Sequence, residues 1–295
     1  MLVLAVAAGI LVVVGGLLTY SIIRYRRRRD DDGSEPPQVY GSDQIELAWT
    51  VIPTIIVIAL GLVTARTIYD VQDAQKPPGA TEVTVIGHQW WWEIRYPELG
   101  IVTANELHVP ASEDPAVAPT FLELESADVV HSFWVPQLAG KTDLIPNRRN
   151  RMWIAPREPG LYLGQCAEFC GTQHAHMLLR VRVHPRAEYE RWVAAQQQSA
   201  VADPAVAEGR RIFESTACIS CHTVRGTVAT GRFGPDLTHL MSRETLAAGA
   251  DSMSRAALHA WIQDPDHLKP GALMPAMKLD DAALDQLVAY LHTLR

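Results

Sequence analysis

The 295-residue sequence predicts a multidomain chain, in which a two-helix transmembrane hairpin precedes an all-β unit and then an all-α unit. Two long apolar runs fill most of the first 72 residues. Alternating and β-branched segments, separated by Gly and Pro, lie between residues 75 and 185. A Cys-x-x-Cys-His motif follows in a part whose apolar residues recur at helical spacing. The expected domains are 1–72, 73–190 and 205–295, with a polar linker at 191–204.

The composition excludes several classes of protein. The formal net charge is −7 and the sequence has no basic stripe, so we exclude nucleic-acid binding. The four cysteines form two close pairs, whereas a disulfide framework would spread them to join distant segments. Two tight pairs, each followed by histidine, indicate cofactor sites.

Two apolar runs predict membrane helices. Residues 2–23 carry no charge and are long enough to cross a bilayer. A second run spans about 47–63, with Trp49 and Tyr69 as interfacial aromatic residues. Pro53 within it is tolerated in a membrane helix. We therefore expect the chain to be anchored in the cell's inner (plasma) membrane.

Arginines after the first run predict the orientation of the hairpin. They are Arg24, Arg26, Arg27, Arg28 and Arg29. Positively charged loops stay in the cytoplasm, so the N-terminus and everything after about residue 70 should lie on the outer, periplasmic side. A cleaved signal peptide is the alternative, but its charges would precede the apolar run.

Four segments of the middle unit predict strands in a small antiparallel sandwich or barrel. They are residues 81–86, 120–125, 151–154 and 178–183.

A cluster of soft ligands lies near the end of this unit. Cys166, Cys170, His174 and Met177 occur within twelve positions, and His131 lies upstream in a Val-His-Ser-Phe-Trp run. A zinc site would have no need of methionine, and a thioredoxin-like pair would begin a helix. A mononuclear blue-copper site would use a single cysteine. Two thiolates and two imidazoles suit two copper ions that share one electron.

This pattern resembles the CuA domain of cytochrome c oxidase subunit II. The Gly-His-Gln-Trp-Trp-Trp run at 87–92 and the two preceding helices also match that family, so the resemblance covers residues 1 to about 185. It implies a cupredoxin barrel and a binuclear copper site. The implied ligands are bridging Cys166 and Cys170, terminal His131 and His174, weakly bound Met177, and the backbone carbonyl of Glu168.

The resemblance also implies partners and further roles. The Glu168 carboxylate would hold a magnesium or manganese ion at the interface with subunit I. Trp90 resembles the aromatic residue through which electrons reach the copper, although a packed barrel aromatic is the alternative. Glu46 matches a carboxylate near the mouth of a proton channel in subunit I, and is otherwise a solvated acid. Asp128 matches an acid of a docking surface, whereas the neighbouring acidic position is Ala127 here.

The motif formed by Cys218, Cys221 and His222 predicts covalent attachment of a c-type haem, with the histidine bound to iron. Helices expected at 205–216 and 280–294 resemble the crossing pair of the class I cytochrome c fold.

The sixth iron ligand should be a methionine. The candidates are Met241, Met253, Met274 and Met277. The Lys-Pro-Gly-Ala-Leu-Met-Pro run resembles the ligand loop of the family and favours Met274, with Met277 as the alternative. The Pro235 carbonyl should accept a hydrogen bond from the iron-bound histidine.

Together these resemblances imply subunit II of a haem–copper oxidase with a fused cytochrome c domain. Electrons would pass from a cytochrome c or an upstream complex to the haem, then to CuA, and on to haem in subunit I, where oxygen is reduced and protons are translocated. Subunit III is a further expected partner. The alternative is a membrane-tethered copper and haem carrier that serves another reductase. Nitrous oxide reductase also uses CuA, but nothing here resembles its histidine-rich propeller.

Overall fold

The computed structural model describes residues 1–26, 33, 35, 37–38, 40–72, 75–112, 119–201 and 203–295. These residues form two compact units, Met1–Val71 and Gln72–Arg295. Arg27, Arg28 and Arg29, on which the predicted orientation partly depends, lie outside the described residues.

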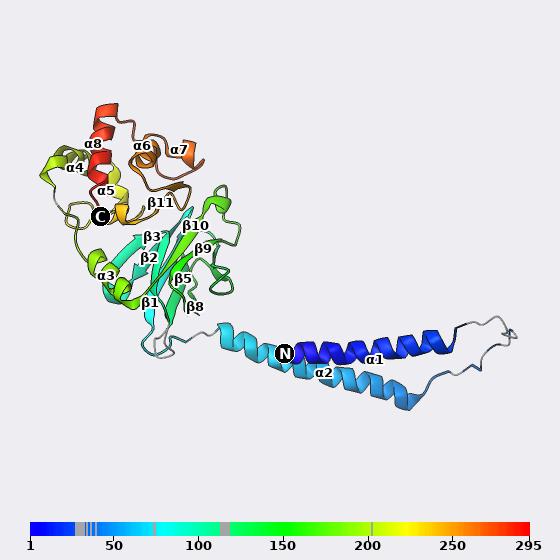
Figure 1. Ribbon diagram of the computed structural model, residues 1–295. Helices are drawn as coiled ribbons and strands as arrows, with labels where there is room; N and C mark the ends of the chain where they lie inside the picture. Colours follow the sequence, from blue (N-terminus) through cyan, green and yellow to red (C-terminus); the bar gives the residue numbers. More distant parts are fainter. Residues whose placement is uncertain are drawn as a thin grey trace. The chain divides into compact units, whose positions relative to one another are not determined.

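The first unit consists of helices α1 (Leu2–Arg24) and α2 (Asp43–Gln72) (Figure 1). Both are long and apolar enough to cross a membrane, with mean hydropathies of 2.7 and 2.3 over their best windows. Their apolar side chains are exposed within this chain, as expected of helices that face lipid. Pro53 lies inside α2 without ending it.

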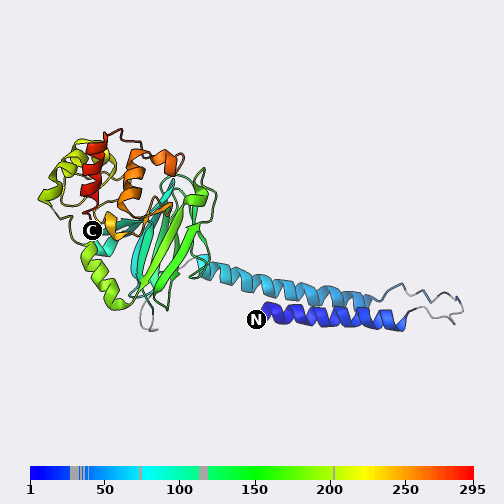
Figure 2. The ribbon, with the colours of Figure 1, turned by 45° about the horizontal axis from the view of Figure 1, so that its top comes forward.

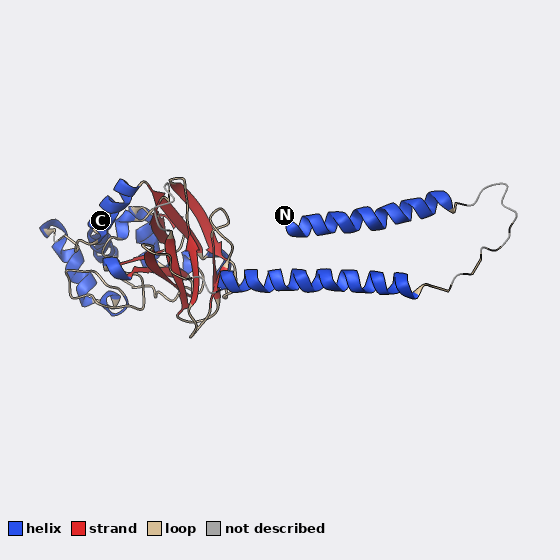
Figure 3. Ribbon diagram, turned by 90° about the horizontal axis from the view of Figure 1, so that it is seen from below, coloured by secondary structure: helices blue, strands red, loops and turns tan. Residues whose placement is uncertain are grey.

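The second unit begins with two β-sheets (Figure 3). In the described part of the chain each sheet has five strands, in the orders β3-β2-β1-β5-β8 and β4-β10-β9-β6-β7. The strands are β1 (Thr81–His88), β2 (Trp91–Tyr96), β3 (Ile101–Ala104), β4 (Glu106–Pro110), β5 (Thr120–Ser126), β6 (His131–Trp134), β7 (Thr142–Leu144), β8 (Asn150–Ile154), β9 (Gly160–Cys166) and β10 (Leu178–His184). The all-β prediction is therefore confirmed, and the four predicted segments are strands.

The pairing is mixed, which differs from the antiparallel arrangement that the alternating segments predicted. β1 pairs parallel with β5, and β10 pairs parallel with β4. A parallel pair needs a crossover connection, and here the intervening chain crosses to the other sheet before it returns. Alternation along one strand reports which face is buried and carries no information on the direction of its neighbour.

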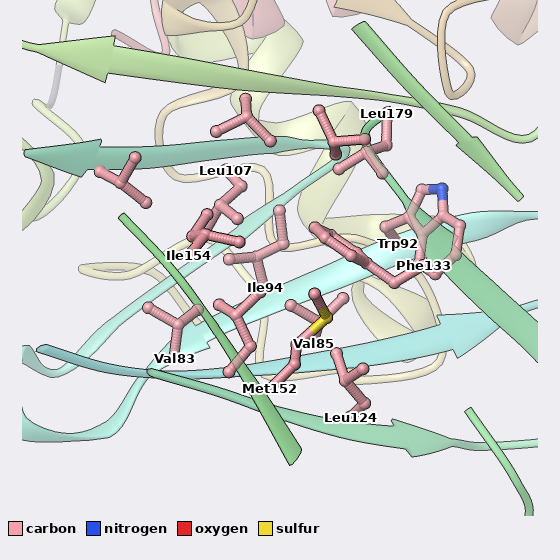
Figure 4. Packing of buried hydrophobic residues seen from close by; sticks show 14 of the residues in the cluster. Val83, Val85, Trp92, Ile94, Leu107, Leu124, Phe133, Met152, Ile154 and Leu179 are labelled. Atoms are coloured by element: carbon pink, nitrogen blue, oxygen red, sulfur yellow. The ribbon is translucent and has the colours of Figure 1, made fainter. Parts of the chain in front are cut away.

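Apolar side chains from both sheets meet in one core (Figure 4). Val83 and Val85 of β1, and Trp92 and Ile94 of β2, point inward at alternate positions and are fully buried. Each side chain of this size contributes about 1.5–3 kcal/mol when it leaves water. Of the Trp-Trp-Trp run, only Trp92 belongs to this buried set.

The C-terminal part is helical, apart from a two-stranded ribbon (β11, Thr245–Leu246; β12, Asp251–Ser252). Its helices are α4 (Ala207–Ser215), α5 (Cys218–Cys221), α6 (Arg255–Gln263), α7 (Pro265–Leu268) and α8 (Asp281–Leu291). Short 3₁₀ turns lie at Pro97–Leu99 (η1), His174–His176 (η2), Pro204–Val206 (η3) and Leu240–Ser242 (η4).

Helices α4 and α8 cross, as predicted (Figure 1). The rings of Phe213 and Tyr290 meet at the crossing, with centroids 5.7 Å apart. Gly209 permits the close approach, because a Cβ there would overlap the carbonyl of Gln286. Asp280 caps α8 by accepting a hydrogen bond from the Ala283 amide.

The connection between the two parts is itself structured. Helix α3 (Arg186–Gln196) runs into the segment expected to be a linker and packs on β4 and β10 (Figure 2). The Trp192 ring stacks on His108, with centroids 4.4 Å apart, and on Tyr189 three residues earlier. Both aromatic side chains lie on one helix face, so burying them holds the helix against the sheet.

Candidate metal centre and haem pocket

The two cysteines of the β unit lie side by side at the end of β9. Their Sγ atoms are 3.8 Å apart, far longer than the 2.05 Å or so of a disulfide, and both side chains are buried. The carbonyl oxygen of Glu168 lies 3.2 Å from the Cys166 Sγ, while the Glu168 carboxylate is exposed. The residue therefore presents its backbone to the sulfur atoms and its side chain to the surface.

His131 reaches the cysteines from the neighbouring strand. Phe133 of β6 pairs with Cys166 of β9, which brings the start of β6 beside the sulfur atoms. His131 is fully buried, with Nδ1 4.0 Å from the Cys166 Sγ. A Cβ on Gly87 would lie 2.6 Å from this ring, so the close packing requires glycine there.

Asp128 holds the other nitrogen of His131. Its Oδ1 lies 2.7 Å from Nε2, and the carboxylate also accepts hydrogen bonds from the backbone amides of Gln89 and Val129. Burial raises the pKa of Asp128, but these hydrogen bonds outweigh burial and hold it below its usual value. The sequence predicts that Asp128 belongs to a docking surface and does not predict its contact with His131. The spacing of three positions between the two residues could have indicated this contact.

The remaining donors come from the turn that leads into β10. His174 Nδ1 lies 3.6 Å from the Cys170 Sγ, and the fully buried Met177 places its Sδ 3.9 Å from the same sulfur. His176, between them, instead hydrogen-bonds through Nδ1 to the Gln173 side chain at 2.8 Å.

The two thiols titrate as a pair. The hydrogen bond between them lowers the pKa of Cys166 and raises that of Cys170. One thiolate therefore forms readily, whereas a second thiolate beside it needs a cation to balance the charge.

The donor set fits a pair of soft metal ions. The ligand atoms of His131, Cys166 and Cys170 all lie within 4.8 Å of one another. With His174, Met177 and the Glu168 carbonyl the site has six donors, two of them the cysteine sulfur atoms, which is two more than one tetrahedral zinc ion uses. Thiolate, thioether and imidazole together favour copper.

Trp90 lies directly beside this centre. Its indole Nε1 donates to the Cys170 carbonyl at 3.0 Å, and the Gln89 side-chain amide donates to the same oxygen at 2.8 Å. Gly171, with φ of +117°, leaves room for the indole ring, since a Cβ there would lie 3.0 Å from it.

The second site is a pocket around the Cys-x-x-Cys-His motif. Cys218 and Cys221 lie on α5, and the three motif residues line the pocket. His222 Nδ1 donates to the Pro235 carbonyl at 2.7 Å, as predicted, which leaves Nε2 for iron. Burial lowers the pKa of His222 and so favours the neutral imidazole that binds a metal.

Three of the four candidate methionines line this pocket: Met253, Met274 and Met277. Met241 does not line it, and its backbone amide instead donates to the Leu294 carbonyl at 2.8 Å. The structure places both Met274 and Met277 at the pocket, so the choice between them stays a prediction. An apolar pocket lined by one histidine and two cysteines fits a covalently bound haem.

The pocket also has a wall from the β unit. Trp90, Trp91 and Asn105 line it together with residues of the helical part. No pattern near the haem motif could have indicated these residues, which lie far upstream in the chain. Trp90 thus borders the haem pocket while its indole N–H binds the copper-site loop.

Glu46 lies in the first turn of α2. There its carboxylate is near the positive end of the helix dipole, which is favourable without any further role.

Comparisons with known proteins show the family of the chain. Three family models match: the transmembrane domain of cytochrome c oxidase subunit II over residues 1–66, its periplasmic domain over 114–183, and cytochrome c over 206–295. Cytochrome c oxidase subunit 2 of Alkalihalophilus pseudofirmus is 36% identical, and the match covers 88% of this chain and 76% of that protein. The chain belongs to the cytochrome c oxidase subunit II family.

Further relatives extend over the C-terminal part. Cytochrome c oxidase subunit 2 of Bacillus subtilis is 31% identical over 94% of this chain and 82% of that protein. The crystal structure of the periplasmic domain of subunit II (CoxB) from Bradyrhizobium japonicum is 28% identical and matches 42% of this chain and 97% of that one, with a TM-score of 0.39.

Membership of the family settles the class of protein. This subunit is a membrane-anchored component of cytochrome-c oxidase with a fused cytochrome c domain. The family implies the binuclear copper centre CuA and a subunit I partner, and the cytochrome c domain implies haem. Below, the β unit is called the copper domain and the C-terminal part the haem domain.

Proposed function

We propose that this subunit accepts electrons at its haem, passes them to CuA, and delivers them to haem in subunit I for the reduction of oxygen coupled to proton translocation. The position of Trp90 supports this route most strongly. The residue lines the haem pocket and donates a hydrogen bond to the carbonyl of Cys170, a proposed copper ligand.

The proposed copper ligands are the two cysteine thiolates and the four donors around them. They are His131, Cys166, the Glu168 carbonyl, Cys170, His174 and Met177. When bound, the copper pair takes up and releases one electron. His131, Cys166, Cys170 and Met177 are buried, so water is excluded from these four donors. Asp128 fixes the tautomer and orientation of His131. A closed, preformed donor set changes little in geometry on electron transfer.

His222 and Met274 would bind the haem iron, and the thiols of Cys218 and Cys221 would attach the haem covalently. Met277 is the alternative sixth ligand. The Pro235 carbonyl orients His222 through Nδ1.

Three residues carry roles at the borders of the subunit. Trp90 would conduct electrons into the copper site. The exposed Glu168 carboxylate would bind magnesium or manganese at the subunit I interface, and Glu46 would lie at the mouth of a proton channel in subunit I.

The orientation and the other partners are proposed as well. The two soluble domains would lie on the outer side of the plasma membrane, where a cytochrome c or an upstream complex can donate electrons. Subunit III would accompany subunit I in the assembled oxidase.

An electron paramagnetic resonance spectrum of the purified oxidase tests the proposal. A mixed-valence signal from two equivalent coppers supports it, and a single-copper signal contradicts it. Co-purification of a many-helix subunit that carries its own haem and copper supports the oxidase role. If no such subunit co-purified, the result would favour a tethered carrier that serves another reductase.

A further inference from the structure

Lys269 is a buried lysine between the two soluble domains. The residue follows α7 in the haem domain, and its side chain belongs to the buried set, with the residue only 4% exposed. Its Nζ donates to the carbonyl oxygens of Trp90 at 2.7 Å, Ala247 at 3.0 Å and His176 at 3.1 Å. An ammonium group has three N–H donors, so all three are used.

The acceptors lie on both sides of the domain boundary. Trp90 and His176 belong to the copper domain, where they flank the metal centre, whereas Ala247 belongs to the haem domain. Among the described residues Lys269 forms no ion pair, and burial lowers its pKa to about 8. An ammonium group without a carboxylate is costly to bury unless its hydrogen bonds are made, and only the docked arrangement supplies all three acceptors.

The segment after Lys269 continues this contact. The Gln173 side-chain amide donates to the Pro270 carbonyl at 2.8 Å, and the Leu178 amide donates to the Ala248 carbonyl at 3.1 Å. At Gly271 a Cβ would lie 3.8 Å from the Trp90 ring, so the backbone passes along the indole. The loop that leads to Met274 is therefore hydrogen-bonded to the loop that carries the copper ligands.

Other contacts join the domains farther from this point. Glu244 forms ion pairs with Arg180 and Arg182, and the Glu106 carboxylate accepts hydrogen bonds from the Glu244 and Thr245 amides at 2.8 and 2.9 Å. The Arg–Glu pairs are partly exposed to solvent, which screens their attraction, so each contributes little to holding the domains together. They provide a matched control at the same interface.

We propose that Lys269 is a positioning residue for internal electron transfer, which locks the haem-ligand loop onto Trp90 and the copper-ligand loop. This inference rests on the proposed route from haem to CuA. The step moves one electron from the reduced haem iron to the oxidised copper pair, and no bond is made or broken. Because the two loops are held together, the step needs no diffusional docking of the haem domain.

The test compares Lys269→Met with Glu244→Gln in the intact oxidase. Methionine keeps much of the apolar volume and removes all three donors. After rapid photochemical reduction of the haem, we expect internal transfer in the wild type to be single-phase and unchanged when glycerol raises the viscosity. In Lys269→Met it should be roughly tenfold slower and viscosity-dependent, because only a fraction of molecules is docked at any moment. Glu244→Gln should stay within about twofold of the wild type.

Hydrogen–deuterium exchange gives a readout that does not depend on turnover. The Leu178 amide bonds across the boundary, so a peptide containing it should exchange faster in Lys269→Met and at the wild-type rate in Glu244→Gln. The copper and haem spectra of Lys269→Met should remain those of the wild type, which separates positioning from assembly of the sites.

Unchanged exchange together with an unchanged transfer rate in Lys269→Met would overturn the proposal. If that variant fails to assemble, the viscosity dependence of the wild type tests the proposal. A wild-type transfer rate that falls as viscosity rises overturns the proposal, and a constant rate supports it. Absence of a binuclear copper signal from the wild type would overturn the proposed function, and this inference with it.

Discussion

The copper centre and the haem pocket are built in different ways. Every proposed copper ligand belongs to the copper domain: five of the six lie between Cys166 and Met177, and the sixth, His131, lies on the adjoining strand β6. The haem pocket, in contrast, takes part of its wall from the other domain, through Trp90, Trp91 and Asn105. The copper site can therefore form within one domain, whereas the complete haem environment requires two domains to dock.

The largest effect is expected from a substitution of a bridging cysteine in the copper centre, which lies within one domain. In Cys166→Ser the bridging sulfur is replaced by a hard oxygen that binds copper poorly. We expect the binuclear copper signal to disappear and oxygen consumption to fall to background, while the haem absorption stays unchanged. A mixed-valence signal that survived the substitution would remove Cys166 from the ligand set.

The second prediction concerns the shared pocket and separates its two candidate ligands. Met274→Leu should abolish the methionine-to-iron absorption band and lower the haem potential by on the order of 100 mV, because the soft thioether is lost. Met277→Leu serves as the matched control and should keep both. The opposite pattern would assign the iron to Met277.

A smaller effect is expected just outside the copper ligands. Asp128→Asn keeps the shape of the side chain but removes the charge that holds His131 Nε2. Loss of such an outer partner typically lowers metal affinity about 10- to 100-fold. Copper titration of the metal-free protein would measure the affinity, with Glu123→Gln on the preceding strand β5 as the control. Equal affinities in the two variants would contradict a role for Asp128 at the centre.

The last prediction concerns the stability of the copper domain at low pH, away from both cofactor sites. Burial, together with the nearby charges of His184 and two arginines, lowers the pKa of His108 to about 3. The unfolded chain binds a proton at this histidine below about pH 6.5, whereas the folded chain stays neutral. The free energy of unfolding should therefore fall by up to about 1.4 kcal/mol per pH unit as the pH drops from 6.5 towards 3.

Urea unfolding of the detergent-solubilised protein, followed by tryptophan fluorescence, would measure this dependence. His108→Phe keeps a ring for stacking on Trp192 and removes the titrating group. The slope of its unfolding free energy against pH should therefore be smaller than that of the wild type by up to about 1.4 kcal/mol per pH unit. Parallel pH profiles for the two proteins would show that His108 does not contribute.

Sequence analysis predicts what depends on local spacing. Cys218, Cys221 and His222 are adjacent, and the ligands from Cys166 to Met177 fall within one loop, so their chemistry is visible before any fold is known. The four predicted strands were also found, because alternation follows directly from which face of a strand is buried.

Contacts that form only when the two domains dock could not be predicted from local spacing. Lys269 meets Trp90 only because two domains pack together, and neither residue carries a pattern that points to the other. Helix α3 is a different case, since Tyr189 and Trp192 lie three positions apart and indicate an apolar helix face that extends into the expected linker at 191–204.

The structured connection has a consequence for neighbouring oxidase molecules. Helix α3 ends at Gln196 and η3 begins at Pro204, so only residues 197–203 separate them. Seven residues span about 25 Å at full extension, and Arg225 hydrogen-bonds to the carbonyl of Gln196 at the start of this segment. At that reach, the haem domain meets the copper domain of its own chain at a higher effective concentration than the copper domain of a neighbouring molecule.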